Sequence, residues 1–563
     1  LGLGHRLKLG GEHTVGSWLS ERRRNGGLTW RPGDRLFDPV FEPSQTTTWP
    51  FSGVINSTWG GEVQLDAGLQ NSALYLQDDV SLNRFVALNL GARLGRWSGR
   101  LAPTIGAPRF DAVRDVALEP RLGISIDPSG HEAVVLKAHW GRYHQGLFAG
   151  LFDRADGASV FSDEERWAYS GPIFPDPTTR FTPAERDALA AQGQFERVET
   201  IRLSEVGRVE GYRQPYVDQA VVGLEVAFGR HWKAEVAYVD RRNRDMVALV
   251  DRNLESNYTV FENVRVLDRF LRPVFFGGKE LLLPRLAISN EDLIREWAHR
   301  QQGDSFRNWV MPPPGMTVAE MNQLSYQPDL VLTTAPEARR HFRQLQLVLH
   351  GRFPAWWLSG SAAITKLRGN LNSVTGNDDD SRSGAGPFVR LNEQFDAYGG
   401  LSNQSEVEVK LQAGGNLPLG FRGGTFVSYA SGDLLTPYLT LSSLLLEFDR
   451  PEFTDRPAAE RVLSDELVRT TTGHRIYLLP RGTLRYPARW TLDLHLERGF
   501  RVGGTQLVLT SDAFNLLGTD KTTEIQTSLT GDAAVGEFSG YGRVRNRVPP
   551  RSFRFGLILR AGS

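Results

Sequence analysis

Charged and histidine side chains recur at alternate positions in many segments of this chain, with apolar side chains between them. Groups of this kind can bind a ligand, line a path filled with water or simply face solvent, and histidine changes its charge near neutral pH. No HExxH, GxSxG or P-loop motif accompanies them, so the sequence predicts no enzyme. The residues that we single out are Arg93, Lys137, His139, Glu225, Lys233, Glu235, His350, Glu406, Glu408, Lys410, Asp493, His495 and Glu497.

One acidic run has the composition of a cation site. The run Asn377-Asp378-Asp379-Asp380 could hold Ca²⁺, but it lacks the glycine and the terminal glutamate of an EF-hand loop. A solvated acidic loop is therefore the favoured interpretation. The chain has no cysteine, which excludes disulfides and thiolate metal sites. We predict neither a metal nor another cofactor.

The alternating side chains require β-strands to position them. In Trp490 to Asn515, Leu492, Leu494 and Leu496 share one face and Asp493 and His495 the other. A period of two is that of a strand. Gly503-Gly504 allows a tight reversal, after which Leu507 and Leu509 alternate with polar residues. An apolar face, a polar face and ~10 residues per strand match a transmembrane hairpin.

The same pattern recurs along the whole chain and predicts roughly fifteen strands. Leu88 and Leu90 alternate with polar residues, as do Val222 and Leu224, and Asp127-Pro128-Ser129-Gly130 is a strong turn signal. Connections within hairpins are short. Those between hairpins are long, and we expect them at residues 145–216, 251–341, 369–403, 432–488 and 516–551.

This asymmetry favours an outer-membrane barrel over a soluble fold. Compact soluble domains rarely contain unstructured loops beyond ~12–15 residues, whereas these barrels combine short periplasmic turns with long external loops. A soluble core would bury Lys137 or Asp493 unpaired, at a cost of several kcal/mol each. Trp140, Trp232, Trp356 and Trp490 lie where aromatic girdles are expected.

The remaining composition is compatible with this interpretation. The 563 residues carry a net charge of +0, so no nucleic-acid partner is predicted. No apolar run reaches the ~18–20 residues of a membrane helix. Small helices are expected in the external loops, beginning at Thr182-Pro183-Ala184-Glu185, Ser289-Asn290-Glu291-Asp292 and Thr317-Val318-Ala319-Glu320.

Several segments together resemble the barrel of TonB-dependent outer-membrane receptors, of the Oar-like group with a carboxypeptidase-regulatory-like domain. They spread from near residue 70 to the end of the chain: LYLQDDVSLNRFVALNLGARL, LEPRLGISIDPSGHEAVVLKAHWGRYH, YVDQAVVGLEVAFGRHWKAEVAYVDRRNRD, LVLTSDAFNLLGTD and VPPRSFRFGLILR.

The resemblance implies a 22-stranded barrel preceded by a plug domain with a TonB box. The chain opens with Leu1, inside an alternating segment and without a signal peptide, and neither plug nor box is recognisable. We therefore expect residues 1–563 to be part of the barrel domain, without the plug and the first strands. The family usually ends on an aromatic residue read by the barrel assembly machinery, whereas this chain ends Arg560-Ala561-Gly562-Ser563.

The function implied by the resemblance is energy-coupled uptake of a scarce substrate such as a siderophore, cobalamin, oligosaccharide or peptide. Its partners would be outer-membrane lipid, the TonB complex acting through the plug, the barrel assembly machinery and an unidentified ligand. One alternative is a passive porin-like channel or a surface adhesin barrel. A second is a soluble extracellular β-propeller or carbohydrate-binding protein, although no repeat of ~40–50 residues is evident.

Overall fold

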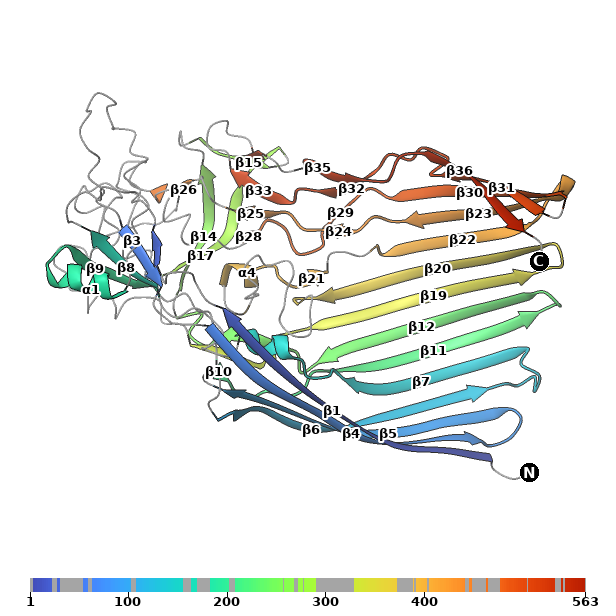
Figure 1. Ribbon diagram of the computed structural model, residues 1–563, viewed down its shortest axis with the longest axis horizontal. Coiled ribbons are helices and arrows are strands. Elements are labelled where there is room, and N and C mark those ends of the chain that lie inside the picture. Colours follow the sequence, from blue (N-terminus) through green and yellow to red (C-terminus); the bar gives the residue numbers. More distant parts are fainter. Residues whose placement is uncertain are drawn as a thin grey trace.

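The protein is dominated by one large antiparallel sheet, seen in a computed structural model (Figure 1). The structure describes residues 4–22, 28–30, 54–58, 63–102, 108–154, 164–169, 183–201, 208–256, 258–267, 272–276, 278–289, 329–371, 388, 391–401, 405–440, 445–447, 462–463, 476–503, 505–531, 538–539 and 542–561. The sheet has 15 strands, in agreement with the number predicted, and the all-β antiparallel fold is confirmed.

The strands of the sheet follow one another in chain order. Each strand is hydrogen-bonded to the next one along the chain, to which a tight turn or a long connection joins it. In order across the sheet they are β1 (Gly4–Arg22), β4 (Val63–Ser81), β5 (Val86–Ala102), β6 (Phe110–Ile126), β7 (Val134–His144), β11 (Tyr216–Phe228), β12 (Trp232–Arg244), β19 (Arg340–Arg352), β20 (Trp356–Gly369), β22 (Val407–Asn416), β23 (Phe421–Ala430), β30 (Arg489–Val502), β31 (Thr505–Phe514) and β36 (Ser552–Ala561), with the short β21 (Gly399–Gly400) paired to β20.

The two edges of the sheet are β1 and β36. In the described part of the chain β1 is paired only with β4, and β36 only with β31. Among these residues, no ladder joins the strand near Leu7 to the strand near Phe555.

Short turns lie at one end of the sheet and long connections at the other. Figure 1 shows the tight turns and both termini at one end, and the short strands gathered beyond the opposite end. At the turn between β30 and β31, Gly503 has φ +60°, a conformation that glycine adopts without strain. At the turn after β6, Asp127 accepts backbone hydrogen bonds from Gly130 (3.0 Å) and Glu132 (2.7 Å), and a side-chain hydrogen bond from Ser129. These bonds hold the pKa of the Asp127 carboxyl below its usual value, the Ser129 hydroxyl contributing most.

The long connections form small sheets of their own. Their strands are β10 (Arg208–Val209) with β18 (Leu330–Thr334) and β13 (Val247–Asp251); β17 (Leu282–Ser289) with β14 (Tyr258–Leu267), β26 (Leu445–Glu447) and β27 (Val462–Leu463); β15 (Phe275–Phe276) with β16 (Lys279–Glu280); β2 (Leu28–Trp30) with β3 (Val54–Thr58), β8 (Glu164–Tyr169) and β9 (Phe195–Ile201); β24 (Leu434–Leu435) with β29 (Leu484–Arg485); β28 (Ile476–Tyr477) with β25 (Tyr438–Thr440), β33 (Ser528–Gly531) and β34 (Phe538–Ser539); and β32 (Thr522–Ile525) with β35 (Val544–Arg547).

Helices are few among the described residues, and none is long and apolar enough to cross a membrane. The helix expected near Pro183 is present as α1 (Pro183–Ala191), and Gly193 follows it with φ +73°. The others are α4 (Leu391–Gln394), η2 (Ala149–Arg154) and η4 (Pro418–Gly420). Of the helix expected from Ser289, only Ser289 is described, and it ends β17, while residues 317–320 and the acidic run 377–380 lie outside the described ranges.

One apolar core lies on the large sheet itself. Trp97 (2% exposed) and Leu101 of β5 pack with Phe152 (0% exposed) of η2 and with Leu249 and Leu332 of β13 and β18. Trp97 is four residues from Arg93 on the same strand, and alternation places both on one face. The long connections therefore fold back over the face of the sheet that carries Arg93.

Candidate functional site

The predicted polar residues share one face of the large sheet. Residues directly paired across antiparallel strands point to the same side, as do residues two apart. Lys137 is paired with Gly223, Glu225 with Glu235, and Lys233 with His350. Continued across the sheet, the register places on this polar face Arg93, Lys137, His139, Glu225, Lys233, Glu235, His350, Glu408, Lys410, Asp493, His495 and Glu497. Glu406 precedes β22, two residues before Glu408. That this face lines a lumen stays a prediction.

The opposite face is apolar and open to its surroundings. It carries Val222 (50% exposed), Leu224 (39%) and Leu494 (40%), which a soluble protein would cover. Leu88 and Leu90 share this face with Val222, since Leu88 pairs with Ile124, Ile124 with Ala138 and Ala138 with Val222.

Ion pairs between strands satisfy the charges of the polar face. Glu225 on β11 contacts Lys233 on β12, with Nζ 2.7 Å from Oε2, and is also paired with Lys137 on β7. His495 on β30 lies 2.6 Å from Asp512 on β31, which also contacts Arg554 at 2.9 Å. Arg485 lies 2.5 Å from Glu406. The first two groups of contacts join neighbouring strands of the large sheet, and the third joins the start of β22 to β29 among the long connections.

The most buried ionic cluster centres on Glu119, which the sequence analysis did not single out. The Glu119 side chain is 2% exposed and contacts Arg93 at 2.7 Å, Arg121 at 3.4 Å and His144 at 3.5 Å. Arg93 is in addition paired with Glu12. The sequence does contain a feature that could have identified Glu119. The period-two alternation of β6 puts Leu118 and Leu122 on the apolar face and therefore Glu119 on the polar face.

Three of the predicted residues meet in a cavity of about 980 Å³ near the tight turns. His350, His495 and Glu497 line it with Trp357 and Arg422, and the Arg422 guanidinium lies 3.2 Å from Glu497. Part of its wall is a cross-strand pair of glycines, Gly414 and Gly424. A Cβ on Gly414 would lie 3.0 Å from Nε1 of Trp357, so the missing side chain makes room for the indole. The cavity therefore combines aromatic, cationic and anionic side chains on the polar face.

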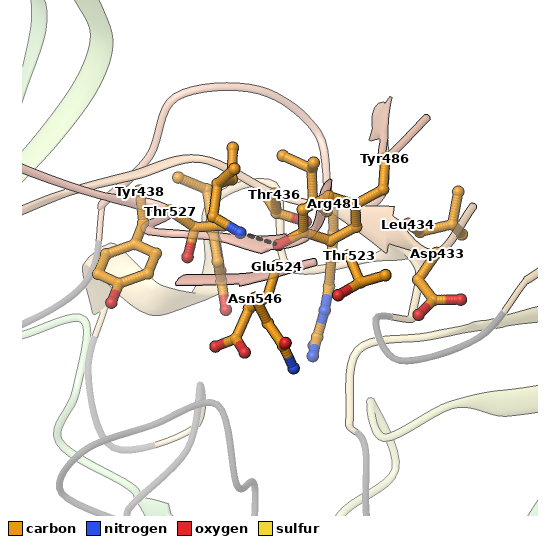
Figure 2. A pocket seen from close by; sticks show the side chains of 13 residues that line it. Asp433, Leu434, Thr436, Tyr438, Arg481, Tyr486, Thr523, Glu524, Thr527 and Asn546 are labelled. Atoms are coloured by element: carbon orange, nitrogen blue, oxygen red, sulfur yellow. Dashed lines mark hydrogen bonds between the residues drawn. The ribbon is translucent and has the colours of Figure 1, made fainter. Parts of the chain in front are cut away.

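A second pocket, of about 410 Å³, lies among the long connections at the other end of the sheet. Its walls come from β24, β25, β28, β32 and β35, and Figure 2 shows the polar ends of Glu524, Asn546 and Arg481 pointing in one direction. Tyr438, Tyr477 and Tyr486 add aromatic surface. The volume falls within the ~300–1,000 Å³ typical of small-molecule sites.

Hydrogen bonds hold this pocket in shape. The backbone N–H of Ile525 donates to Tyr486 Oη at 3.3 Å, and that of Gly482 donates to Thr436 Oγ1 at 2.8 Å. Burial raises the pKa of the Tyr486 hydroxyl, so it is neutral at physiological pH. The pocket thus offers neutral hydroxyls together with both signs of charge. The sequence analysis identified none of its residues, because they come from two separate connections, between β23 and β30 and between β31 and β36.

The predicted residues do not form one site. Glu408 and Lys410 are paired at 3.5 Å, His139 contacts Tyr143 at 2.7 Å, and Asp493 accepts the backbone N–H of Asn515 at 2.7 Å. Among the described residues, no group of three or more His, Asp or Glu side chains is placed to hold a metal ion.

Comparison with known proteins finds similarity in solved structures alone, since no family model and no curated protein matches the chain. The outer membrane transporter YddB from Escherichia coli is 12% identical over 99% of this chain and 51% of its own, with a TM-score of 0.47. The ferric-catecholate import receptor Fiu from E. coli K12 is 12% identical over 99% of this chain and 52% of its own, with a TM-score of 0.40.

The siderophore receptor PiuA from Acinetobacter baumannii is 11% identical over 99% of this chain and 53% of its own, with a TM-score of 0.38. The chain thus spans about half the length of each of these structures. What the whole protein does is taken up below as a proposal.

Proposed function

We propose that this sheet is part of the wall of a β-barrel in the outer membrane of a Gram-negative bacterium, and that the protein is a receptor for energy-coupled uptake. One observation carries the proposal: a single sheet has an exposed apolar face and a charged face, with tight turns at one end only. Lipid on one side and water on the other accounts for both faces without burying a charge.

The pocket among the long connections is the proposed place of ligand capture. It lies at the end where barrels of this type carry their external loops. Its carboxylates, guanidinium, tyrosines and threonines suit a small ligand with several hydrogen-bonding groups. Such side chains fix orientation and specificity more than they supply apolar burial.

Coupling to the TonB complex is the part of the proposal that rests on the sequence resemblance. The polar face offers a surface that a plug domain would contact, and the cavity of about 980 Å³ beside Trp357 opens on this face. A passive channel would need no such coupling, which makes energy dependence the discriminating property.

Cellular uptake tests the receptor against the passive channel. The full-length protein is expressed in cells lacking their own receptors, and accumulation of labelled ferric siderophores, cobalamin, oligosaccharides and peptides is measured with and without an uncoupler. Accumulation of one substrate that stops when the membrane is de-energised or TonB is deleted supports the receptor. Uptake that follows the external concentration in both conditions supports the channel instead.

Substitutions in the pocket test the place of capture. With the substrate found in the uptake assay, Asn546→Ala and Thr523→Val are expected to weaken binding about tenfold each, because each removes a hydrogen-bonding group. Lys279→Gln, an exposed change on β16 outside the pocket, serves as the matched control. If all three variants bind the substrate with the same affinity, the substrate does not bind in this pocket.

A further inference from the structure

The apolar face of the sheet ends abruptly at a band of basic side chains. On β7, β11, β12, β19 and β20, one row of paired residues is Ala138, Val222, Tyr238, Leu345 and Ile364. The next row toward the long connections is Trp140, Ala220, Asp240, Arg343 and Lys366, and the row beyond it is Arg142, Asp218, Arg242, His341 and Arg368. We call these last two rows the basic band.

The band carries an excess of positive charge in a protein whose net charge is +0. It contains five arginine or lysine side chains and two carboxylates. Arg142 is paired with Asp218 at 2.8 Å. Asp240 is shared by Arg242 (3.0 Å), Arg343 (3.3 Å) and His341 (2.8 Å). The single carboxylate of Asp240 thus contacts two guanidinium groups and an imidazole, and it cannot neutralise both guanidinium charges.

Two further cations of the band contact no carboxylate among the described residues. Lys366 and Arg368 are exposed, and in the described part of the chain neither contacts an aspartate or a glutamate. Arg242 and Arg343 are half exposed, at 53% and 52% of their side chains. The band can therefore accept anionic groups from outside the protein.

At the level of the band, the same face of the nearby β5 and β6 stays apolar. It continues apolar as far as Leu94 (49% exposed) and Leu118 (57% exposed), which are paired, and the exposed Arg96 and Arg114 follow only in later rows. Five adjacent strands at ~4.8 Å spacing make the band about 19 Å wide. That width exceeds a single phosphate, so the band can contact more than one headgroup phosphate along the membrane surface.

We propose that the basic band binds the phosphate groups of lipid headgroups, whose acyl chains lie on the apolar rows directly below. Guanidinium groups bind phosphate with two parallel hydrogen bonds, and basic residues at a membrane surface attract anionic lipid. The apolar rows favour a lipid over a free phosphate ion as the ligand, because only a lipid can contact both the basic band and the apolar rows. This inference rests on the membrane placement proposed above.

Native mass spectrometry of the full-length protein in neutral detergent tests it. The probes are lipid A carrying both phosphates, the same lipid after removal of the phosphates, and inorganic phosphate. The wild type is expected to retain phosphorylated lipid A, to retain the dephosphorylated lipid at least tenfold more weakly, and not to lose the lipid to millimolar inorganic phosphate. Equal retention of both lipids, or displacement by phosphate alone, would overturn the proposal.

The variants use a control on the same strand. Arg242→Gln with Lys366→Gln is expected to weaken retention of phosphorylated lipid A by about fivefold per charge removed. Arg241→Gln removes one charge, next to Arg242 but on the opposite face, where Arg241 contacts Gln219 at 2.7 Å, and should leave retention unchanged. An equal loss per charge removed in both variants would contradict a role for this face. Arg242→Lys, which keeps the charge, should retain most of the binding.

The same preparation separates this inference from the membrane placement. A protein outside a membrane would retain neither form of lipid, and a spin label at Leu224 would be accessible to water. Retention of the two lipid forms alike, with Leu224 shielded, would leave the membrane placement intact and reject the basic band alone.

Discussion

Lys233 and Glu225 join two neighbouring strands of the polar face, with Nζ of one 2.7 Å from Oε2 of the other. The residue directly opposite Glu225 is Glu235, so two carboxylates face each other across the strands. Lys233, together with Lys137 on the other side, balances their repulsion. One residue away, Leu224 and Val236 are paired on the apolar face. A shift of one residue in this register would reverse both faces, which makes these strands sensitive reporters of the fold.

The first prediction concerns the surroundings of the two faces. Spin labels at Leu88, Leu90, Val222, Leu224, Leu492 and Leu494 should be accessible to lipid-soluble oxygen and shielded from aqueous quenchers, since all six lie on the apolar face. Labels at Glu225 and Asp493 are the controls and should show the reverse. Aqueous accessibility at all six apolar positions would rule out the membrane wall.

The second prediction compares stability on the two faces of one strand. Leu224→Arg should destabilise the protein by about 2–4 kcal/mol, because it places a charge in the middle of the apolar face. Glu225→Gln, at the neighbouring position on the polar face, should cost about 1 kcal/mol or less. The measurement is urea unfolding in lipid vesicles. Equal costs for the two variants would contradict a lipid face backed by a wet one.

The third prediction concerns the buried Glu119 cluster. Glu119→Ala should destabilise the protein by about 3 kcal/mol, since it leaves the largely buried Arg93, and the more exposed Arg121, without this carboxylate. Glu12→Gln removes the more exposed partner of Arg93 and should cost about 1 kcal/mol or less. Thermal unfolding of both variants distinguishes them, and a larger loss from Glu12→Gln would contradict the assignment of Glu119 as the centre.

The fourth prediction concerns the pH dependence of the turn after β6. The Asp127 pKa lies below its ordinary value of 3.8, so its hydrogen bonds stabilise the turn above that value and are lost as the pH falls through the lowered pKa. Exchange of the Gly130 and Glu132 amide hydrogens, followed from pH 6 to pH 2, should therefore lose protection only below pH 3.8.

Asp127→Asn is the control for that titration. The amide side chain keeps one acceptor but does not ionise, so the remaining protection should show no step in this range. A step that persists in Asp127→Asn would assign the pH dependence to another group.

The sequence by itself determined the large sheet, because the alternation within each strand shows which of its residues share a face. Period-two alternation in segments such as Trp490 to Val502 identified strands and separated apolar from charged positions. Asp127-Pro128-Ser129-Gly130 and Gly503 marked tight turns by local backbone preference. These signals depend only on neighbours in the chain, which is why the strand number and the long connections agree with the structure.

Only the tertiary structure decided which residues meet. The pocket among the long connections joins Asp433, Arg481 and Asn546, and its short strands, some of two residues, are too short to show a period. The basic band depends on the register of five strands, because Arg142 and Arg368 share a row only through four successive strand pairings. Alternation states which face a residue occupies, whereas its height on that face is fixed by interstrand hydrogen bonds between distant parts of the chain.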